Sequence, residues 1–298
     1  MTGIINVYKE KGYTSHDVVA IMRRIAGTKK VGHTGTLDPD ATGVLPICIG
    51  RATKLAEHLA AQDKTYIAQI ILGIETNTGD ISGEIMAKKP VTFDEAAIAQ
   101  TVKSFLYSER GEYLQVPPMY SAIKIGGKKL YELARKGETI DRPPRPVAIH
   151  DIAVLDYTPA ENAFTIRVKC SKGTYIRSLA TDIGAALGCG ATMGELTRTQ
   201  SGAFSIDTAT KLDALKAAGE RGELAPFVLP VDALLPYPKI TIAGEDLARA
   251  LNGNPLPIAL ANGADSPKFW VYSHTGELIG LYANDGKKLR VEVLMWTL

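Results

Sequence analysis

Residues 30–50 read KVGHTGTLDPDATGVLPICIG and place His33, Asp38 and Asp40 in a run interrupted by four glycines and two prolines. These interruptions make a long helix or strand unfavourable, so the pattern predicts a turn-rich loop. The apolar residues 44–49 that follow predict a buried strand. Asp38 and Asp40 fit a turn, because aspartate often bonds turn amides, and they also fit a reactive site. Both interpretations stay open on composition alone.

The loop lacks the sequences that hold nucleotide phosphates, because no Gly-Lys-Ser/Thr follows and no dinucleotide-type glycine triplet closes it. Residues 32–46, GHTGTLDPDATGVLP, resemble the catalytic loop of the TruB family of tRNA pseudouridine-55 synthases. The resemblance implies that Asp38 is the indispensable carboxylate of this family. It also implies that His33 enters the RNA loop and stacks in place of the extracted base.

Three more segments resemble motifs of the same family, in the same order. Residues 64–66, KTY, match its Lys-x-Tyr motif, which implies that the Tyr66 ring lies on the target base and that its hydroxyl is the candidate general base. Residues 172–177, KGTYIR, imply that Arg177 pairs with the catalytic carboxylate and that Tyr175 walls the base pocket. Leu196 aligns less closely with an apolar residue that packs on the base. Without the resemblance, a tyrosine at a strand edge such as Tyr66 is more often a packing residue, and a lone arginine at a helix start such as Arg177 is usually a surface residue.

Residues 113–150 carry most of the excess positive charge. Seven basic residues stand against three acidic ones there, whereas residues 236–298 balance six against six. The basic residues are Lys124, Lys128, Lys129, Arg135, Lys136, Arg142 and Arg145. Paired prolines and glycines predict an excursion from the core, and such a run is often only a solvated face. Here it resembles the thumb loop that closes over the tRNA arm, which implies phosphate contacts from Lys124, Lys128 and Lys129.

Length and composition set limits on the class of protein. The chain has 298 residues, 45% hydrophobic and 22% charged, and a formal net charge of +2, which alone does not argue for nucleic acid. No apolar run reaches the length of a membrane span, and the N-terminus lacks a signal-peptide pattern, so we expect a cytoplasmic protein with no membrane partner. Cys48, Cys170 and Cys189 show no metal-ligand spacing and are expected to be reduced.

The order of elements predicts an α+β fold. We expect a strand at residues 3–7, a helix capped by Ser15, a helix at 51–61, and strands at 64–73 and 164–170. Lys9 is either a substrate contact or a solvated strand end. The resemblance implies a mixed α/β body on a largely antiparallel sheet with flanking helices and a thumb loop.

A proline-rich linker at 229–238 precedes a small β-rich unit. We therefore expect a catalytic domain at 1–235, with a thumb at about 113–150, and a PUA-like RNA-binding domain at 236–298. By position, the second unit resembles the C-terminal appendage of the family.

The resemblance implies isomerisation of uridine to pseudouridine at position 55 in the T-loop of tRNA, after base flipping, with Asp38, Tyr66 and Arg177 as the catalytic residues. It implies no cofactor and no metal, because the reaction breaks and remakes a glycosidic bond without a redox step. The expected partner is the T-arm and T-loop of tRNA, bound by a monomer. Two alternatives are a tRNA-binding or tRNA-folding module that does not catalyse, and a carboxylate hydrolase built on Asp38 and Asp40.

Overall fold

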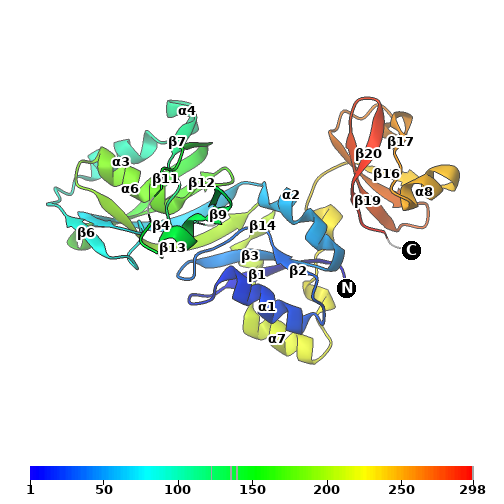
Figure 1. Ribbon diagram of the computed structural model, residues 1–298, viewed down its shortest axis with the longest axis horizontal. Coiled ribbons are helices and arrows are strands. Elements are labelled where there is room, and N and C mark those ends of the chain that lie inside the picture. The colour runs from blue at the N-terminus through cyan, green and yellow to red at the C-terminus, as the bar shows by residue number, and fades with distance from the viewer. Residues whose placement is uncertain (122, 135, 139, 297–298) are drawn as a thin grey trace.

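The computed structural model describes residues 1–296 except 122, 135 and 139, and only the backbone of residues 110, 124 and 129 (Figure 1). A mixed sheet forms the body. Its order is β11 (Ile149–Thr158), β12 (Ala163–Cys170), β4 (Lys64–Leu72), β13 (Ala191–Ser201), β3 (Thr42–Ile49), β1 (Gly3–Lys9) and β15 (Thr210–Lys211). β2 (Val31–His33) pairs with β3, and β14 (Phe204–Ser205) pairs with β13. Along this order only β13–β3 and β1–β15 are parallel, so the sheet is largely antiparallel as expected.

Strand β3 is buried from both sides, which explains its continuous apolar sequence. Leu45, Ile47 and Ile49 belong to a core shared with α1 (Ser15–Ile25) and α7 (Leu212–Glu220). Val44 and Cys48 alternate with them and enter a second core on the opposite face. The predicted strand at 44–49 is therefore confirmed.

The start of α1 differs from the prediction. Thr14, not Ser15, is the N-cap residue, and it forms a capping box with Asp17. The Ser15 hydroxyl instead accepts from the Leu37 amide at 2.9 Å and lies 3.2 Å from the Leu37 carbonyl, to which it donates. Ser15 therefore fastens the predicted loop to α1.

The other half of the sheet carries the remaining helices of the body. A third core lies against β4, β12 and β13 and receives α6 (Ile176–Ala186) and α3 (Glu95–Lys103). The predicted helix at 51–61 consists of a 3-10 segment, Gly50–Leu55, and a short α2, Ala56–Ala60. A small hairpin, β5 (Ile74–Thr76) and β6 (Ile85–Lys88), and the one-turn α4 (Tyr107–Arg110) complete this lobe.

The basic segment leaves the body between two paired strands. β7 (Tyr113–Gln115) and β10 (Arg145–Val147) are antiparallel and close its base. Between them lie the two-residue strands β8 (Lys124–Ile125) and β9 (Lys128–Lys129) and the helix α5 (Leu130–Ala134). Leu130 and Leu133 of α5 are buried, so the excursion has a small apolar anchor.

The C-terminal residues form a separate sheet, at upper right in Figure 1. Its elements are β16 (Lys239–Ile242), α8 (Gly244–Leu251), β17 (Leu256–Pro257), β18 (Lys268–Ser273), β19 (Leu278–Asn284) and β20 (Lys288–Leu294). Trp270 and Met295 of this unit share a core with Val44 of the body, and the Trp270 indole donates to the Leu235 carbonyl at 2.9 Å. The unit therefore packs against the body through a buried apolar contact.

Candidate active site

The predicted site residues meet where the two halves of the sheet join. Strand β13 pairs with β4 on one side and with the start of β3 on the other, placing Arg198 opposite both Tyr66 and Gly43. Residues 34–41 lead into β3 at this seam. Arg177 stands in the first turn of α6, which packs on β13. Segments far apart in the sequence thus converge on one place.

Asp38 and Arg177 form an ion pair, with 3.0 Å between Asp38 Oδ2 and Arg177 Nε. The Arg177 side chain is 6% exposed and that of Asp38 43%, so the cation is buried while the carboxylate faces solvent. Arg177 also donates to the carbonyls of Thr78 at 3.1 Å and Tyr120 at 2.7 Å. It therefore joins the catalytic loop, the β5–β6 hairpin and the base of the thumb.

Asp80 is a second carboxylate at this cation, with 3.7 Å between its Oδ2 and Arg177 Nε. Its Oδ1 accepts from the hydroxyls of Thr78 at 2.8 Å and Ser82 at 2.5 Å. Asp80 lies outside the four motifs that resemble the family. It stands in a polar turn, and that sequence does not indicate a contact with Arg177. Arg177 is thus shared between two carboxylates.

The pKa of Asp38 is raised above its ordinary value of 3.8. Partial removal from solvent is the largest cause; Arg177 acts in the opposite direction, and Asp80 adds a repulsive like charge. Although 43% of the Asp38 side chain is exposed, protein atoms crowd the carboxylate and burial outweighs the ion pair. Asp38 is thus ionised less readily than an ordinary aspartate.

We expect Asp80→Asn to move the acid limb of the pH–rate profile to lower pH. Asp80 raises the Asp38 pKa, so its neutralisation lowers that pKa and keeps Asp38 ionised in more acidic solution. The asparagine retains Oδ1 as an acceptor for Thr78 and Ser82. The measurement is the single-turnover rate, against pH, of the reaction that the resemblance implies.

Asp40→Asn is the matched control for this change. Asp40 raises the Asp38 pKa as Asp80 does but has a weaker effect, so the shift on its neutralisation should be smaller. An unchanged or upward-shifted limb in Asp80→Asn would contradict the electrostatic assignment.

Lys9 supports the loop of residues 32–46 from inside the protein, so it is neither a substrate contact nor a solvated strand end. Its side chain is fully buried, and its Nζ donates to the carbonyls of Pro39 at 3.0 Å and Ala41 at 2.6 Å. Burial lowers its pKa to about 8. The ammonium therefore fixes the backbone on the C-terminal side of Asp38.

Tyr66 and Leu196 line the apolar part of the site. Both belong to one core cluster with Leu37 of the catalytic loop, and they are 8% and 9% exposed. Burial raises the pKa of the Tyr66 hydroxyl, against the opposing effect of the Arg198 cation. The phenol is therefore neutral at ordinary pH.

His33 ends β2 and is half-buried. Its Nδ1 accepts from the Gly35 amide at 3.2 Å, so the proton of the neutral ring lies on Nε2. Burial lowers its pKa to about 4, and the His16 ring packs edge-on with 5.4 Å between the ring centroids. His33 thus presents an uncharged ring beside the loop.

Gln115 positions Tyr175 and was missed at the sequence level. The 1%-exposed amide accepts from the Tyr175 backbone N–H at 2.7 Å and donates to the Tyr175 carbonyl at 2.9 Å. It thereby ties the base of the thumb to the start of α6, two residues before Arg177. A lone glutamine offers no sequence signal of such a role.

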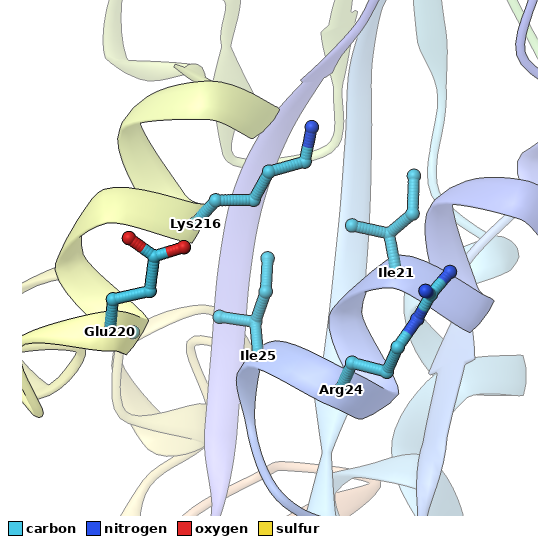
Figure 2. A pocket seen from close by; sticks show the side chains of 6 residues that line it. Ile21, Arg24, Ile25, Lys216 and Glu220 are labelled. Carbon is cyan, nitrogen blue, oxygen red and sulfur yellow. The ribbon is translucent and has the colours of Figure 1, made fainter.

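Two basic residues of the thumb have exposed side chains. Lys128 and Lys136 are exposed. The side chains of Lys124 and Lys129, and Arg135 as a whole, lie outside the described residues. A groove of about 520 Å³ between α1 and α7, lined by Ile21, Ile25 and Lys216 among others, also lies elsewhere and contains none of the predicted site residues (Figure 2).

The sequence matches two models of one protein family and several relatives. A model of the N-terminal domain of TruB family pseudouridylate synthases matches residues 23–176, and a model of the tRNA pseudouridylate synthase B C-terminal domain matches residues 177–236. The tRNA pseudouridine synthase B of Alkaliphilus oremlandii is 49% identical over 255 residues, covering 85% of this chain and 82% of the relative. That of Ralstonia nicotianae is 44% identical over 300 residues, covering 98% and 94%.

A solved structure agrees at the level of the fold. A chain in an H/ACA RNP bound to a substrate RNA containing 2′-deoxyuridine superposes with a TM-score of 0.71 at 26% identity. The match covers 99% of this chain and 85% of the other. With the family models spanning the catalytic loop, the Tyr66 strand and the Arg177 helix, the chain belongs to the TruB family of pseudouridylate synthases.

Proposed function

We propose that this protein isomerises uridine to pseudouridine at position 55 in the T-loop of tRNA. The observation that carries the proposal is the half-exposed Asp38 carboxylate, held by buried Arg177 beside the apolar surface of Tyr66 and Leu196. The names of the relatives, tRNA pseudouridine synthase B, support tRNA as the substrate. Position 55 follows from the match of residues 32–46 to the family motif.

The reaction breaks the bond between uracil N1 and ribose C1′, turns the uracil, and joins its C5 to C1′ with loss of the C5 proton. An ionised carboxylate can attack C1′ or C6, or remove the C2′ proton, without any cofactor. Each of these steps requires the charged form of Asp38. Arg177 favours the charged form because its Nε lies 3.0 Å from Asp38 Oδ2. The ion pair offsets part of the free-energy cost of burying the Asp38 carboxylate.

Tyr66 and Leu196 would enclose the detached uracil and keep it from escaping. The Tyr66 ring stacks on the base, and its hydroxyl is the group that takes the C5 proton. Because burial keeps this hydroxyl neutral, it must release its own proton as it accepts the C5 proton. Uracil N1, which is freed from C1′ and carries a proton in the product, is the site that takes up a proton, so the isomerisation balances. Tyr175, whose backbone is fixed by Gln115, forms a further wall.

The target base must leave its stack first, which costs a few kcal/mol. His33 would fill the vacancy. A neutral ring suits this role because it enters the stack without desolvating a charge, and the lowered pKa of His33 keeps it neutral. Single-stranded loops are where proteins read RNA bases, so a tRNA loop is a suitable target.

The exposed cations of the thumb would contact phosphates of the T-arm. We expect the double variant Lys128→Gln/Lys136→Gln to weaken tRNA binding and to flatten its salt dependence. Each lost phosphate contact removes about 0.7 to 0.9 from the slope of log affinity against log salt, so the slope should fall by about 1 to 2. The measurement is tRNA affinity from low to moderate salt.

Lys103→Gln is the control, because Lys103 is equally exposed but lies at the end of α3. Parallel lines for the double variant and the wild type would show that the thumb carries only a solvated charge run. Stability should change by no more than about 0.5 kcal/mol in either variant.

The C-terminal unit is proposed as a PUA-like RNA-binding domain at 236–298, joined to a catalytic domain at 1–235 with its thumb at about 113–150. We propose that the enzyme binds the T-arm as a monomer and works in the cytoplasm. Among the described residues, no helix has the length and apolar character to span a membrane.

A tRNA-binding or tRNA-folding module without catalysis would use the same site residues and thumb. The Asp38–Arg177 ion pair favours the enzyme, because binding of an anionic RNA gains nothing from a carboxylate in the site. A single-turnover assay with excess protein on a uridine-containing T-arm hairpin separates the two. Pseudouridine in the hairpin supports the enzyme, whereas tight binding without product supports the folding module. Free uracil would instead indicate a hydrolase.

A further inference from the structure

Arg198 is a buried cation at the centre of the site that the reaction chemistry above does not use. It lies on β13 and is 1% exposed. Its Nε donates to the Val44 carbonyl at 2.7 Å, and its two terminal nitrogens donate to the carbonyls of Thr36 at 3.4 Å and Gly35 at 3.2 Å. Among the described residues, no carboxylate forms an ion pair with it. Its partners therefore bracket Asp38 on both sides along the chain.

Such a residue is costly for stability alone. A charge withdrawn from water without a counter-charge loses several kcal/mol of solvation, and apolar side chains of similar volume often serve a core as well or better. Carbonyl dipoles compensate part of this loss, and the planar guanidinium donates to its three carbonyls from three separate nitrogens, whereas an ammonium has one. The three carbonyls at this position are therefore best satisfied by a cation with several donor nitrogens.

Arg198 is also paired with Tyr66 across the β4–β13 ladder. The positive charge of Arg198 opposes the rise in the Tyr66 pKa that burial causes. Because a guanidinium only donates, any hydrogen bond between these two groups has the phenol oxygen as its acceptor. The Tyr66 proton is then directed away from Arg198.

The backbone of Arg198 lies in close contact with Gly43. Gly43 has a φ of 105°, and a Cβ there would lie 2.2 Å from the Arg198 carbonyl oxygen. Strand β13 therefore lies directly against the end of the catalytic loop, and any side chain at Gly43 would push the two apart.

We infer that Arg198 is a positioning residue, which holds the catalytic loop and the Tyr66 hydroxyl in one fixed geometry so that Asp38 and Tyr66 face the target base together. The inference rests on the proposed function and deepens it. Arg198 acts through these groups and touches neither the base nor the RNA backbone, so its loss affects the chemical step more than tRNA binding.

Arg198→Lys and Arg198→Met test this role with a uridine-containing tRNA transcript. Lysine keeps the positive charge but has one donor nitrogen in place of three, and methionine has neither the charge nor a donor. We expect the single-turnover rate to fall at least 30-fold in Arg198→Lys and further in Arg198→Met, while tRNA affinity stays within threefold. Arg167→Lys, an exposed arginine on β12 of the same sheet, should leave both quantities unchanged.

A double-mutant cycle with Tyr66→Phe separates positioning from mere stabilisation. In that background Arg198→Lys should cost markedly less than in the wild type, because the hydroxyl it orients is absent. Rates are taken well below each melting temperature, so that loss of folded protein does not contribute. The Arg198→Lys rate serves when Arg198→Met does not fold.

A rate of Arg198→Lys within threefold of the wild type would overturn the inference, as would a loss explained wholly by weaker tRNA binding. Equal costs in the two backgrounds would overturn the link to Tyr66. If the wild-type protein itself forms no pseudouridine, the proposed function fails instead, so the two failures are distinguishable.

Discussion

Asp38→Asn should abolish pseudouridine formation while leaving tRNA binding intact. The asparagine keeps the shape of the side chain and its position beside Arg177, but it can neither attack ribose or uracil nor take a proton as a carboxylate does. We expect the single-turnover rate to fall by several orders of magnitude, with about 1.4 kcal/mol added to the barrier for each tenfold loss. Affinity for tRNA, measured in parallel, should change little.

Asp40→Asn is the matched loop variant. Asp40 is exposed and has no ion pair with Arg177 among the described contacts, so its rate should stay near that of the wild type at neutral pH. A rate of Asp38→Asn within tenfold of the wild type would remove Asp38 from the chemical step. A large loss in Asp40→Asn would revive a mechanism with two carboxylates.

Replacement of Tyr66 should separate the role of its ring from that of its hydroxyl. Tyr66→Phe retains the ring in the core formed with Leu37 and Leu196 but deletes the proton acceptor, so we expect a loss of about 10² to 10⁴ in rate. Tyr66→Leu also removes the stack, worth about 1 to 3 kcal/mol per base, and should be slower still. The measurement is the single-turnover rate with each variant.

Equal activity of Tyr66→Phe and the wild type would withdraw the general-base role and leave only the stacking role. Equal activity of Tyr66→Leu and Tyr66→Phe would withdraw the stacking role. Because Tyr66 is buried, melting temperatures must accompany these rates.

Local pattern was sufficient for much of the fold. The apolar run of β3, the alternation along β12 and the amphipathic face of α1 identify these elements, because each buries a surface that the sequence marks. The proximity of Asp38 and Arg177 came from motif resemblance, since no local rule brings two residues so far apart in the chain together. The structure provides that contact at 3.0 Å.

The central strand β13 could not be predicted from pattern. Its sequence, ATMGELTRTQS, mixes glycine, charged and hydroxyl residues, although most of it is buried between β4 and β3. The reason is that Arg198 and Thr192 are buried by satisfying carbonyls and hydroxyls rather than by apolar packing. Strand propensity does not indicate burial through polar contacts, so the sequence did not identify Arg198 as a site residue.

The electrostatic balance at Asp38 likewise needed coordinates. The sequence indicates a cation beside the carboxylate, which by itself lowers the pKa. It does not indicate Asp80, nor how closely protein surrounds the site, and these two contributions together reverse the net direction.

The most direct test is to map pseudouridine in cellular tRNA with and without this protein. We expect that position 55 carries uridine when the protein is absent, that wild-type protein restores pseudouridine there, and that equally expressed Asp38→Asn protein does not. Pseudouridine persisting at position 55 without the protein, or restored by Asp38→Asn, would contradict the claim that this chain catalyses that isomerisation through Asp38.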